Sequence, residues 1–347
     1  MEIPVIYLNR LLAETAKKRA TSLHLSVGSA PLWRLNQLLV SLNQEEIVTS
    51  DLINQAIVVT LDANESTEFA AKKEMVIVKT FADGLRYRIN LFYQRGLPAI
   101  TFYYLPDLIE TSAKLNLPPI VTELASRPNG LLIIAGSHGC GKTTTSASLL
   151  EQINQTESKR IITLEQPIEY SFISQKSIVE QRQVGRDTLS LVSGLQYCLN
   201  EDVDVVFVGE PKQDLDKVVL YLLELASGNC LVILEMNAQT TINALEKILS
   251  NISPGKIEAA RHSLADVLIG VAAQKLYPRR SGGLIPAVEI LLGNSTVRSL
   301  IREGRVNQIE NVLQTSRKEG MVHFARAVED LVRTNEIKSD EPTAAPN

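Results

Sequence analysis

The central part of the chain alternates short apolar runs with longer stretches in which apolar residues recur every three to four positions. The longer stretches, residues 189–199 and 215–226, have the spacing of amphipathic helices. The short runs fit strands that are buried on both faces. They span residues 131–135, 160–164, 205–208 and 230–234. Buried strands that alternate with helices predict an α/β domain with a mostly parallel sheet, covered by helices on both faces.

The N-terminal part has a different pattern. Polar and apolar residues alternate there, with many β-branched and aromatic side chains, which is typical of antiparallel strands with one buried face. Residues 6–20 and 50–72 have helical spacing instead. The expected strands are 22–27, 32–42, 74–81, 86–94 and 99–104. These elements predict a small α+β domain over residues 1–105.

Prolines mark a boundary after this domain. Pro106, Pro118, Pro119 and Pro128 bracket a short amphipathic segment, and Pro128 opens a Pro-Asn-Gly turn. Farther on, residues 255–335 have helical spacing apart from a Ser-Gly-Gly turn at 281–283. The predicted parts after the first domain are an interdomain linker at 106–128, the α/β domain at 129–285, a C-terminal helical region at 286–335 and a disordered tail at 336–347.

The strongest chemical signal is the segment 136–143, GSHGCGKT, which fits the pattern G-x-x-x-x-G-K-[ST]. It follows the apolar run 131–135 and precedes a segment compatible with a helix, the context in which this pattern binds phosphate. Glycines let backbone N–H groups turn toward a phosphate, and the helix N-terminus adds partial positive charge. A glycine-rich turn without a ligand is the alternative. The expected phosphate-binding residues are Gly136, Ser137, His138, Gly139, Cys140, Gly141, Lys142, Thr143 and Thr144.

Two side chains of this loop have expected roles in binding a nucleoside triphosphate with Mg²⁺. Lys142 brings a positive charge to the β and γ oxygens, and the Thr143 hydroxyl holds the metal ion. Cys140 has two interpretations. It is either an oxidation-sensitive thiol or a small residue tolerated where the loop uses mainly its backbone, and the second is favoured.

Acidic residues end two of the apolar runs. Glu210 follows the run 205–208 and is the candidate that orients or deprotonates the attacking water in magnesium-assisted hydrolysis. Glu165 follows the run 160–164, and Glu169 comes four residues later. Glu165 and Glu210 are also expected to approach the metal, directly or through water. A solvated carboxylate at a strand end is the alternative for Glu210, and an ordinary surface residue is the alternative for Glu169.

The composition indicates which partners and which cellular compartment to expect. The formal net charge of −4 gives no general attraction to nucleic acid, which is therefore not expected as a partner. No apolar stretch approaches the roughly 18 residues of a membrane span, and the N-terminus is too mixed for a signal peptide, so we expect a cytoplasmic protein. Cys140, Cys198 and Cys230 are far apart and fit reduced thiols rather than a zinc site or a disulfide framework.

Several ordered motifs together resemble the PilT-type retraction ATPases of type IV pili, within the wider family of type II/IV secretion ATPases. In the N-terminal domain, TSLHLSVGSAPLWRLNQLL and GLRYRINLFYQRGLPAITFYYLP resemble that family's PAS-like domain. VRSLIRE resembles the signature of the retraction branch. The other motifs are GSHGCGKTTT, ITLEQPIEY, VEQRQVGRDTLSLVSGLQYCLNEDVDVVFVGE and TVRSLIREGRVNQIENVLQTSRKEGM. The resemblance implies an α/β fold with a RecA-like P-loop NTPase domain, an N-terminal α+β PAS-like domain and C-terminal helices.

The resemblance also implies site residues and partners. Lys142 and Thr143 match the Walker A motif, Glu210 matches the catalytic glutamate of Walker B, and Glu165 matches the acidic box. Arg86, Arg88 and Arg95 fall on the strand pair that supplies positive charge to the γ-phosphate of a neighbouring subunit, although weakly paired surface arginines are the alternative. The implied partners are five further copies in a homohexamer, an inner-membrane pilus platform protein and a paralogous retraction ATPase. Docking on that platform would place the protein at the inner face of the cytoplasmic membrane.

The chain departs from the family pattern at three places. Gln166 replaces an aspartate of the acidic box, which removes a negative charge near the expected magnesium position. Pro211-Lys212-Gln213 replaces Met-Arg-Asp, and Glu235-Met236-Asn237-Ala238 replaces Thr-Leu-His-Thr. Asn237 can donate a hydrogen bond but cannot carry charge or a proton as the histidine would. If that contact acts in the transition state, its loss lowers turnover by roughly a hundredfold.

Two functional interpretations remain open. In the first, the chain is an ATP-hydrolysing motor that drives pilus retraction and twitching motility, and the retained Glu210 favours it. In the second, it is a nucleotide-binding accessory or regulatory paralogue with weakened catalysis, which the missing histidine and aspartates support. DNA translocation by such a ring is a third idea, and the acidic balance counts against it. The C-terminal helices fit either a partner contact or a core, and ATP is chosen over GTP by family likeness alone.

Overall fold

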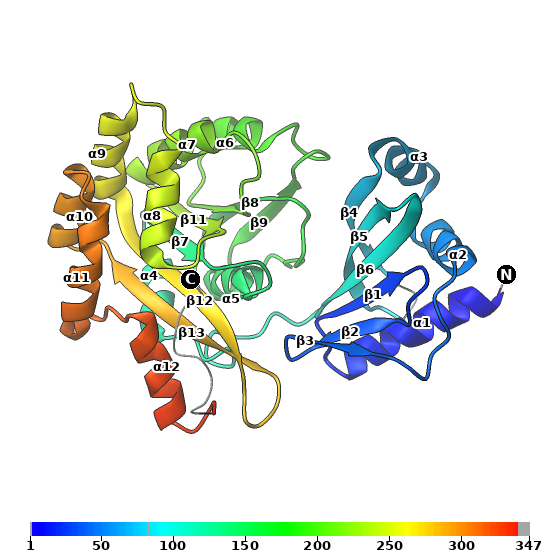
Figure 1. The fold of residues 1–347 in the computed structure, drawn as a ribbon. Coiled ribbons are helices and arrows are strands. Elements are labelled where there is room, and N and C mark those ends of the chain that lie inside the picture. The colour runs from blue at the N-terminus through cyan, green and yellow to red at the C-terminus, as the bar shows by residue number, and fades with distance from the viewer. Residues whose placement is uncertain (1, 82, 339–347) are drawn as a thin grey trace. The chain divides into compact units, whose positions relative to one another are not determined.

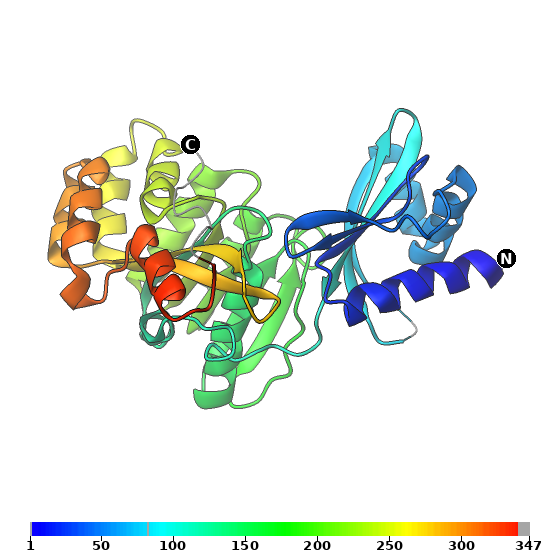
Figure 2. The same ribbon diagram turned by 60° about the horizontal axis from the view of Figure 1, so that its bottom comes forward.

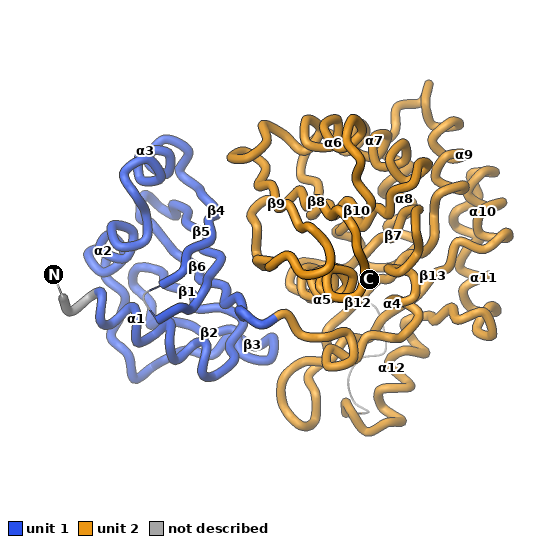
Figure 3. Tube along the Cα trace, turned by 180° about the vertical axis from the view of Figure 1, so that it is seen from behind, with its two compact units in different colours: residues 1–108 blue, residues 109–347 orange. Residues whose placement is uncertain are grey.

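The computed structural model describes residues 2–81 and 83–338. The chain divides into two compact units, Met1–Leu108 and Ile109–Asn347 (Figure 3). We call them unit 1 and unit 2 and describe each by itself.

Unit 1 is built on a six-stranded antiparallel sheet in the order β3-β2-β1-β6-β5-β4 (Figure 1). Its strands are β1 (Ser22–Ser26), β2 (Leu32–Leu35), β3 (Leu38–Ser41), β4 (Glu74–Thr80), β5 (Arg86–Gln94) and β6 (Leu97–Leu105). Its helices are α1 (Glu2–Lys17), α2 (Ser50–Thr60) and α3 (Ala63–Lys72). The α+β class predicted for this part of the chain is confirmed.

The core of unit 1 lies between the sheet and helices α1 and α2. Leu11 of α1, Ile53 of α2 and Phe102 of β6 are fully buried in one apolar cluster. Two polar contacts fix α1 in this core. The Tyr87 hydroxyl donates to the Leu12 carbonyl at 2.6 Å, and the indole nitrogen of Trp33 donates to the Thr15 hydroxyl at 2.8 Å.

One expected strand of unit 1 is two strands. Residues 32–42 form the hairpin β2–β3, because Asn36 and Gln37 both have positive φ angles of 48° and 69°. Two successive residues in this conformation make the tight turn that matches the twist of a hairpin, and asparagine adopts it readily. The polar pair Asn36-Gln37 that interrupts the apolar residues marks this turn in the sequence.

Unit 2 contains a seven-stranded sheet in the order β13-β12-β7-β11-β10-β8-β9. All neighbouring strands are parallel except the antiparallel pair β12–β13. The strands are β7 (Gly130–Ala135), β8 (Arg160–Glu165), β9 (Ile178–Gln183), β10 (Val205–Val208), β11 (Leu231–Met236), β12 (Leu268–Pro278) and β13 (Leu284–Leu292). The mostly parallel sheet predicted from the apolar runs is confirmed.

Helices cover both faces of this sheet (Figure 1). One face packs on α4 (Pro119–Ala125) and α5 (Lys142–Thr156), with Ile134 of β7 and Leu149 of α5 buried between them. The other face packs on a larger group of helices, with Ile133 of β7 and Leu222 of α7 in one cluster. That group includes α6 (Leu191–Leu199), α7 (Leu215–Ser227), α8 (Thr241–Ser250) and α9 (Ile257–Val267).

Most of the segment expected to be an interdomain linker, 106–128, belongs to unit 2. Within it, α4 buries Val121 and Leu124 in the same cluster as Leu132 and Ile134 of the central strand β7. Two of the four prolines that suggested a linker lie at the start of this helix, where Pro118 precedes it and Pro119 occupies its first position. Proline suits that position because the first helical N–H has no intrahelical partner.

The helical structure expected over residues 255–335 is wrong for the strands β12 and β13. Residues 268–292 form a hairpin that extends the sheet beside β7. Residues 268–274 of β12 are almost all buried, and a short apolar run does not separate a buried strand from a buried helix. Pro286 lies in β13, which is the last strand of the sheet, where a missing N–H is tolerated.

Helices do form the rest of the C-terminal region. They are α10 (Ser295–Arg302), α11 (Ile309–Thr315) and α12 (Phe324–Arg333), with the 3₁₀ turns η1 (Val306–Gln308) and η2 (Arg317–Glu319). Figure 2 shows α12 lying along the β12–β13 hairpin. Val297, Ile301 and Val328 are buried in the core of unit 2, which favours the core interpretation of these helices.

One buried carboxylate joins two helix starts in this region. Glu289 of β13 accepts hydrogen bonds from the backbone N–H and the hydroxyl of Thr241 at 2.9 Å each, and from the N–H of Phe324 at 3.2 Å. Thr241 and Phe324 are the first residues of α8 and α12. Farther along, Ile337 is buried, so the predicted tail begins later than residue 336, and its residues 339–347 lie outside the described part.

Candidate phosphate-binding site

Four parallel strands of unit 2 end side by side and bring the predicted site residues to one edge of the sheet. The register pairs Ile133 of β7 with Leu234 of β11, and Leu234 with Val208 of β10. Val208 in turn pairs with Leu164 of β8. The phosphate loop, Asn237, Glu210 and Gln166 follow these strand ends. The carboxyl edge of a parallel sheet is where α/β proteins bind their ligands.

The loop 136–141 joins β7 to α5 and depends on its glycines. Gly136, Gly139 and Gly141 have positive φ angles of 153°, 75° and 88°. A Cβ at Gly136 would collide with the Cys140 sulfur and lie 2.7 Å from the Gln274 carbonyl. Gly141 directly precedes the first helical residue, Lys142. The chain therefore turns sharply and presents a helix N-terminus at the loop, as phosphate binding requires.

Lys142 is buried and points back across the loop. Its ammonium donates to the carbonyls of Gly136 at 2.9 Å and Ser137 at 3.1 Å. The same nitrogen lies 3.5 Å from a carboxylate oxygen of Glu210. Two motifs that are far apart in the sequence thus meet around one ammonium group. The charge of Lys142 is held at the phosphate loop by three oxygen atoms.

Gln274 of β12 braces the loop, a contact that sequence reasoning did not predict. Its amide nitrogen donates to the Cys140 carbonyl at 2.7 Å, and its amide oxygen accepts from the Thr145 hydroxyl at 2.9 Å. Gln274 is 2% exposed, so these bonds are protected from water. Cys140 itself is buried, and burial raises the pKa of its thiol. A buried, protonated thiol favours the interpretation of Cys140 as a tolerated small residue.

Glu165 ends β8 as a buried carboxyl group. It accepts hydrogen bonds from the Thr163 hydroxyl at 2.6 Å and from the Gln181 amide at 3.2 Å. Burial raises the pKa of Glu165 to about 7, and these hydrogen bonds oppose the rise. Gln181 comes from β9, whose polar sequence gave no strand signal. Glu165 and Glu210 border a cavity of about 220 Å³ that Gln166 and Lys212 also line.

Glu235 of β11 is a site residue whose role sequence reasoning missed. It is 4% exposed, and its Oε2 accepts a hydrogen bond from the Thr143 hydroxyl at 3.3 Å. Burial raises its pKa to about 8. The negative charges of Glu169 and Glu165 add to the rise, and the Ser146 hydroxyl and Lys142 oppose it. The sequence did contain a signal for this role, because Glu235 lies near the end of an apolar strand, as Glu165 does.

The remaining departures from the motifs lie around this edge. Asn237 is exposed just after β11, and its carbonyl accepts from the Lys247 ammonium at 2.9 Å. The Lys212 ammonium donates to the Gln166 carbonyl at 3.4 Å. Thr144 lies next to the phosphate loop, with its hydroxyl 3.0 Å from the Tyr170 hydroxyl. Ser137, His138 and Gly139 form the exposed tip of the loop.

The predicted arginines lie in unit 1. Arg86 and Arg88 are two residues apart on β5 and point to the same face, since side chains alternate along a strand. The Arg88 guanidinium stacks on the Tyr103 ring, 4.4 Å from its centre. Arg95 follows β5 in the turn to β6, is exposed and has a φ angle of 51°. Their predicted role toward a γ-phosphate stays a prediction.

Residues 103–340 match the family described as Type II/IV secretion system protein. The chain belongs to this family. It is 30% identical over 332 residues to the type IV pilus retractation ATPase PilT of Pseudomonas aeruginosa, a match that covers 94% of each chain. It is 27% identical over 325 residues to the uncharacterized protein YggR of Escherichia coli, covering 94% of this chain and 98% of that protein.

A solved structure agrees with this family assignment. The crystal structure of the pilus retraction motor PilT with bound ADP is similar with a TM-score of 0.81 and 31% identity. The similarity covers 97% of this chain and 96% of that chain. The resemblance inferred from the motifs is therefore confirmed, and the chain is a member of a nucleotide-binding ATPase family. In the described part of the chain, no helix has the length and apolar character to cross a membrane.

The family implies a magnesium ion that accompanies the nucleotide, and the residues at the loop fit one. Among residues 2–81 and 83–338, no three His, Cys, Asp or Glu side chains form a group that could hold a metal by themselves. Mg²⁺ bound with a nucleotide takes most of its ligands from phosphates and water, so one or two protein oxygens suffice. The Thr143 hydroxyl and the buried Glu235 carboxyl beside it provide such oxygens.

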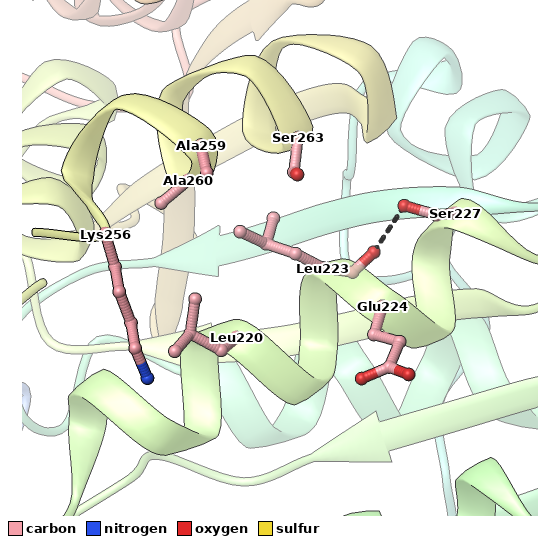
Figure 4. Close-up of a pocket in the computed structure, with 8 residues that line it drawn as sticks. All are labelled: Leu220, Leu223, Glu224, Ser227, Lys256, Ala259, Ala260 and Ser263. Atoms are coloured by element: carbon pink, nitrogen blue, oxygen red, sulfur yellow. Dashed lines mark hydrogen bonds between the residues drawn. The ribbon is translucent and has the colours of Figure 1, made fainter.

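A second cavity of unit 2, of about 380 Å³, lies between α7 and α9 (Figure 4). Leu220, Leu223 and small side chains form most of its wall, and Glu224 and Lys256 are its charged residues. The Ser227 hydroxyl at its edge donates to the Leu223 carbonyl at 2.7 Å, as Figure 4 shows. None of the phosphate-loop residues lines this cavity. It is separate from the candidate site.

Proposed function

We propose that this chain is an ATP-hydrolysing motor of the retraction type, which withdraws type IV pili as one subunit of a homohexamer. The observation that carries the proposal is the meeting of Lys142 and Glu210 at 3.5 Å beside the phosphate loop. A lysine that can neutralise phosphate oxygens and a carboxylate that can orient water are the two groups that phosphoryl transfer to water needs most. The similarity to a pilus retraction motor with bound ADP supports it.

The residues of unit 2 divide the work of this reaction. The loop amides and Lys142 would bind the β- and γ-phosphates, and binding would draw the ammonium away from the Gly136 and Ser137 carbonyls. Glu210 would then be released from Lys142 to hold the attacking water in line. Glu165, fixed by Thr163 and Gln181, would support that water network. Mg²⁺, when bound with the nucleotide, would neutralise charge that develops on the phosphate oxygens.

The hexamer and the arginines belong to the same proposal. Arg86, Arg88 and Arg95 would complete the phosphate site of a neighbouring subunit, because cations on the γ-phosphate oxygens stabilise the transition state of phosphoryl transfer. Nucleotide turnover would then move the units of adjacent subunits relative to one another. The motor would work in the cytoplasm, docked on an inner-membrane pilus platform protein, and a paralogous retraction ATPase could share the work.

A second candidate function is a nucleotide-binding accessory subunit with weakened catalysis. The observation that favours it is Asn237, which stands at the family's histidine position at the end of β11 and cannot carry charge. The replacement of an aspartate by Gln166 beside Glu165 points the same way. Both changes leave Lys142 and the glycines in place, so they weaken catalysis and leave phosphate binding intact.

Steady-state phosphate release from Mg-ATP by the purified protein separates the two candidates. The Lys142→Ala and Glu210→Gln variants are compared with the unaltered protein, with oligomer size and ADP binding measured in parallel. Turnover that disappears in both variants supports the motor. The accessory subunit is supported if the unaltered protein assembles into a ring but releases phosphate no faster than the variants. In that case Lys142→Ala should still abolish ADP binding. Equal nucleotide binding by the protein and by Lys142→Ala would refute both.

A further inference from the structure

Glu235 is a buried carboxyl group with one oxygen engaged and the other without a hydrogen bond. It lies in β11, between β7 and β10, where it pairs with Ile134. Its Oε2 accepts from the Thr143 hydroxyl at 3.3 Å, while its Oε1 is buried and makes no hydrogen bond; the Ser146 hydroxyl lies near enough to lower the pKa of Glu235 but does not reach hydrogen-bond geometry. A buried polar atom normally has a partner, because leaving it unpaired costs about 1 to 3 kcal/mol. An unpaired carboxylate oxygen beside a phosphate loop therefore points to a ligand that contacts it.

The charged groups around Glu235 favour a cation as this ligand. Glu169 and Glu165 repel a negative charge on Glu235, and Lys142 is the positive group that opposes them. That ammonium also interacts with Glu210 and two loop carbonyls, so it does not serve Glu235 alone. A carboxylate that is buried among other carboxylates is stable only when a cation is near. A bound nucleotide brings such a cation to the Thr143 hydroxyl.

The carboxylates around the site differ from those of the family motifs. Gln166 removes a carboxylate at the exit of β8, where the family motif has aspartate, and Glu235 adds one on β11, where the motif has threonine. Gln213 removes a second aspartate of the family motifs after β10, so two carboxylates are lost at this edge of the sheet and one is gained next to Thr143. Oxygen ligands of this kind are the ones that Mg²⁺ prefers.

We propose that Glu235 anchors the divalent cation of bound nucleotide, by accepting a hydrogen bond from the Thr143 hydroxyl and by offering its second carboxylate oxygen. The first action turns the lone pairs of the hydroxyl toward the cation. The second adds a hard, negatively charged oxygen, directly or through one water molecule. This inference rests on the proposed nucleotide binding, and it makes Glu235 a metal-positioning residue peculiar to a site without the acidic-box aspartate.

The other carboxylates of the site are engaged differently. Glu210 is paired with Lys142 and is 33% exposed. Glu165 is tied to the Thr163 hydroxyl and the Gln181 amide through its Oε1. Glu235 is the residue for which the structure records a hydrogen bond to the hydroxyl that the loop motif assigns to the metal.

The test compares metal and nucleotide binding in the full-length protein with its Glu235→Gln variant. A fluorescent ADP derivative is titrated in EDTA and at increasing Mg²⁺, and free Mn²⁺ is followed by electron paramagnetic resonance in the presence of ADP. We expect nucleotide affinity in EDTA to change less than about threefold, because the loop and Lys142 remain. We expect the affinity for Mn²⁺ to fall roughly 10- to 100-fold, as when a residue that supports a metal ligand is lost.

Glu289→Gln is the matched control, because Glu289 is a buried carboxyl group of the same unit that contacts helix starts rather than the loop. It should keep the Mn²⁺ affinity. Glu235→Asp retains the charge on a shorter side chain and should bind Mn²⁺ more tightly than Glu235→Gln does. An Mn²⁺ affinity that is unchanged in Glu235→Gln, with normal ADP binding, would overturn the inference and leave the proposed function standing. Absence of ADP binding by the unaltered protein would refute the proposed function itself.

Discussion

Replacing Glu235 by glutamine should change how the stability of unit 2 depends on pH. Burial raises the pKa of this carboxyl group to about 8, from an ordinary value of 4.5. Between these values the folded protein holds a proton on Glu235 and the unfolded protein does not. The free energy of unfolding therefore falls as the pH rises through this interval, by up to about 1.4 kcal/mol per pH unit. Glutamine does not titrate, so the variant lacks this contribution.

The difference between the two proteins gives the magnitude. From about pH 5 to about pH 7, the unaltered protein should lose about 3 kcal/mol relative to Glu235→Gln, at about 1.4 kcal/mol per unit. Glu165, whose pKa is raised by burial to about 7, contributes a decline to both proteins and largely cancels. This direction is unusual for the replacement of a carboxylate, because the stability of Glu235→Gln relative to the original protein increases as the pH rises.

Urea unfolding in EDTA without nucleotide measures this difference, at about pH 5, 6 and 7. Far-ultraviolet circular dichroism follows both units, whereas the fluorescence of Trp33, the chain's single tryptophan, follows unit 1 and should be unaffected. Glu224→Gln, at an exposed position of α7, is the control and should show no pH-dependent difference. A stability difference between Glu235→Gln and the original that stays constant from about pH 5 to 7 would refute the reasoning.

Three further results are expected. Gly136→Ala should reduce the affinity for ADP, measured by calorimetry, more than tenfold, because the added methyl group would collide with the Cys140 sulfur and the Gln274 carbonyl. An unchanged affinity would show that the loop does not need this conformation. Gln274→Ala removes two buried hydrogen bonds worth about 1 kcal/mol each, so ADP binding should weaken by up to about 30-fold, and a change below twofold would exclude bracing by Gln274. Iodoacetamide near pH 7 should modify Cys140 at least about tenfold more slowly in the folded protein than in urea, because the folded thiol is buried and its pKa is raised. Equal rates in the two states would contradict its burial.

The fold was predictable where one face of an element is buried and the other is not. Strand β5 of unit 1 alternates in burial, and its Tyr87, Ile89 and Leu91 point inward at every second position as expected. The prediction failed at β12, which is buried over most of its length and so lacks alternation. It also omitted β9, a strand at the sheet edge that contains Glu180 and Arg182 among its polar residues.

The site was predictable where a local motif defines it. The phosphate loop, Lys142 and Thr143 follow from adjacent residues, and Glu210 follows from its position after an apolar strand. Gln274 was not predictable, because its contact with the loop depends on β12 pairing with β7, which places Ala273 opposite Ala135. The order of the strands in the sheet cannot be read from the sequence, so this pairing cannot be predicted from it.

The carboxylate of Glu289 has a consequence for how unit 2 assembles. It binds the first N–H of α8 and the first N–H of α12, which lie 48 and 35 residues away in the chain. An anion at a helix N-terminus stabilises the helix only once the two have been brought together. Each helix start gains this stabilisation only once it lies beside Glu289 of β13. The docking of α8 and α12 is thus tied to the completion of the hairpin, and the C-terminal helices are expected to close the fold late rather than nucleate it.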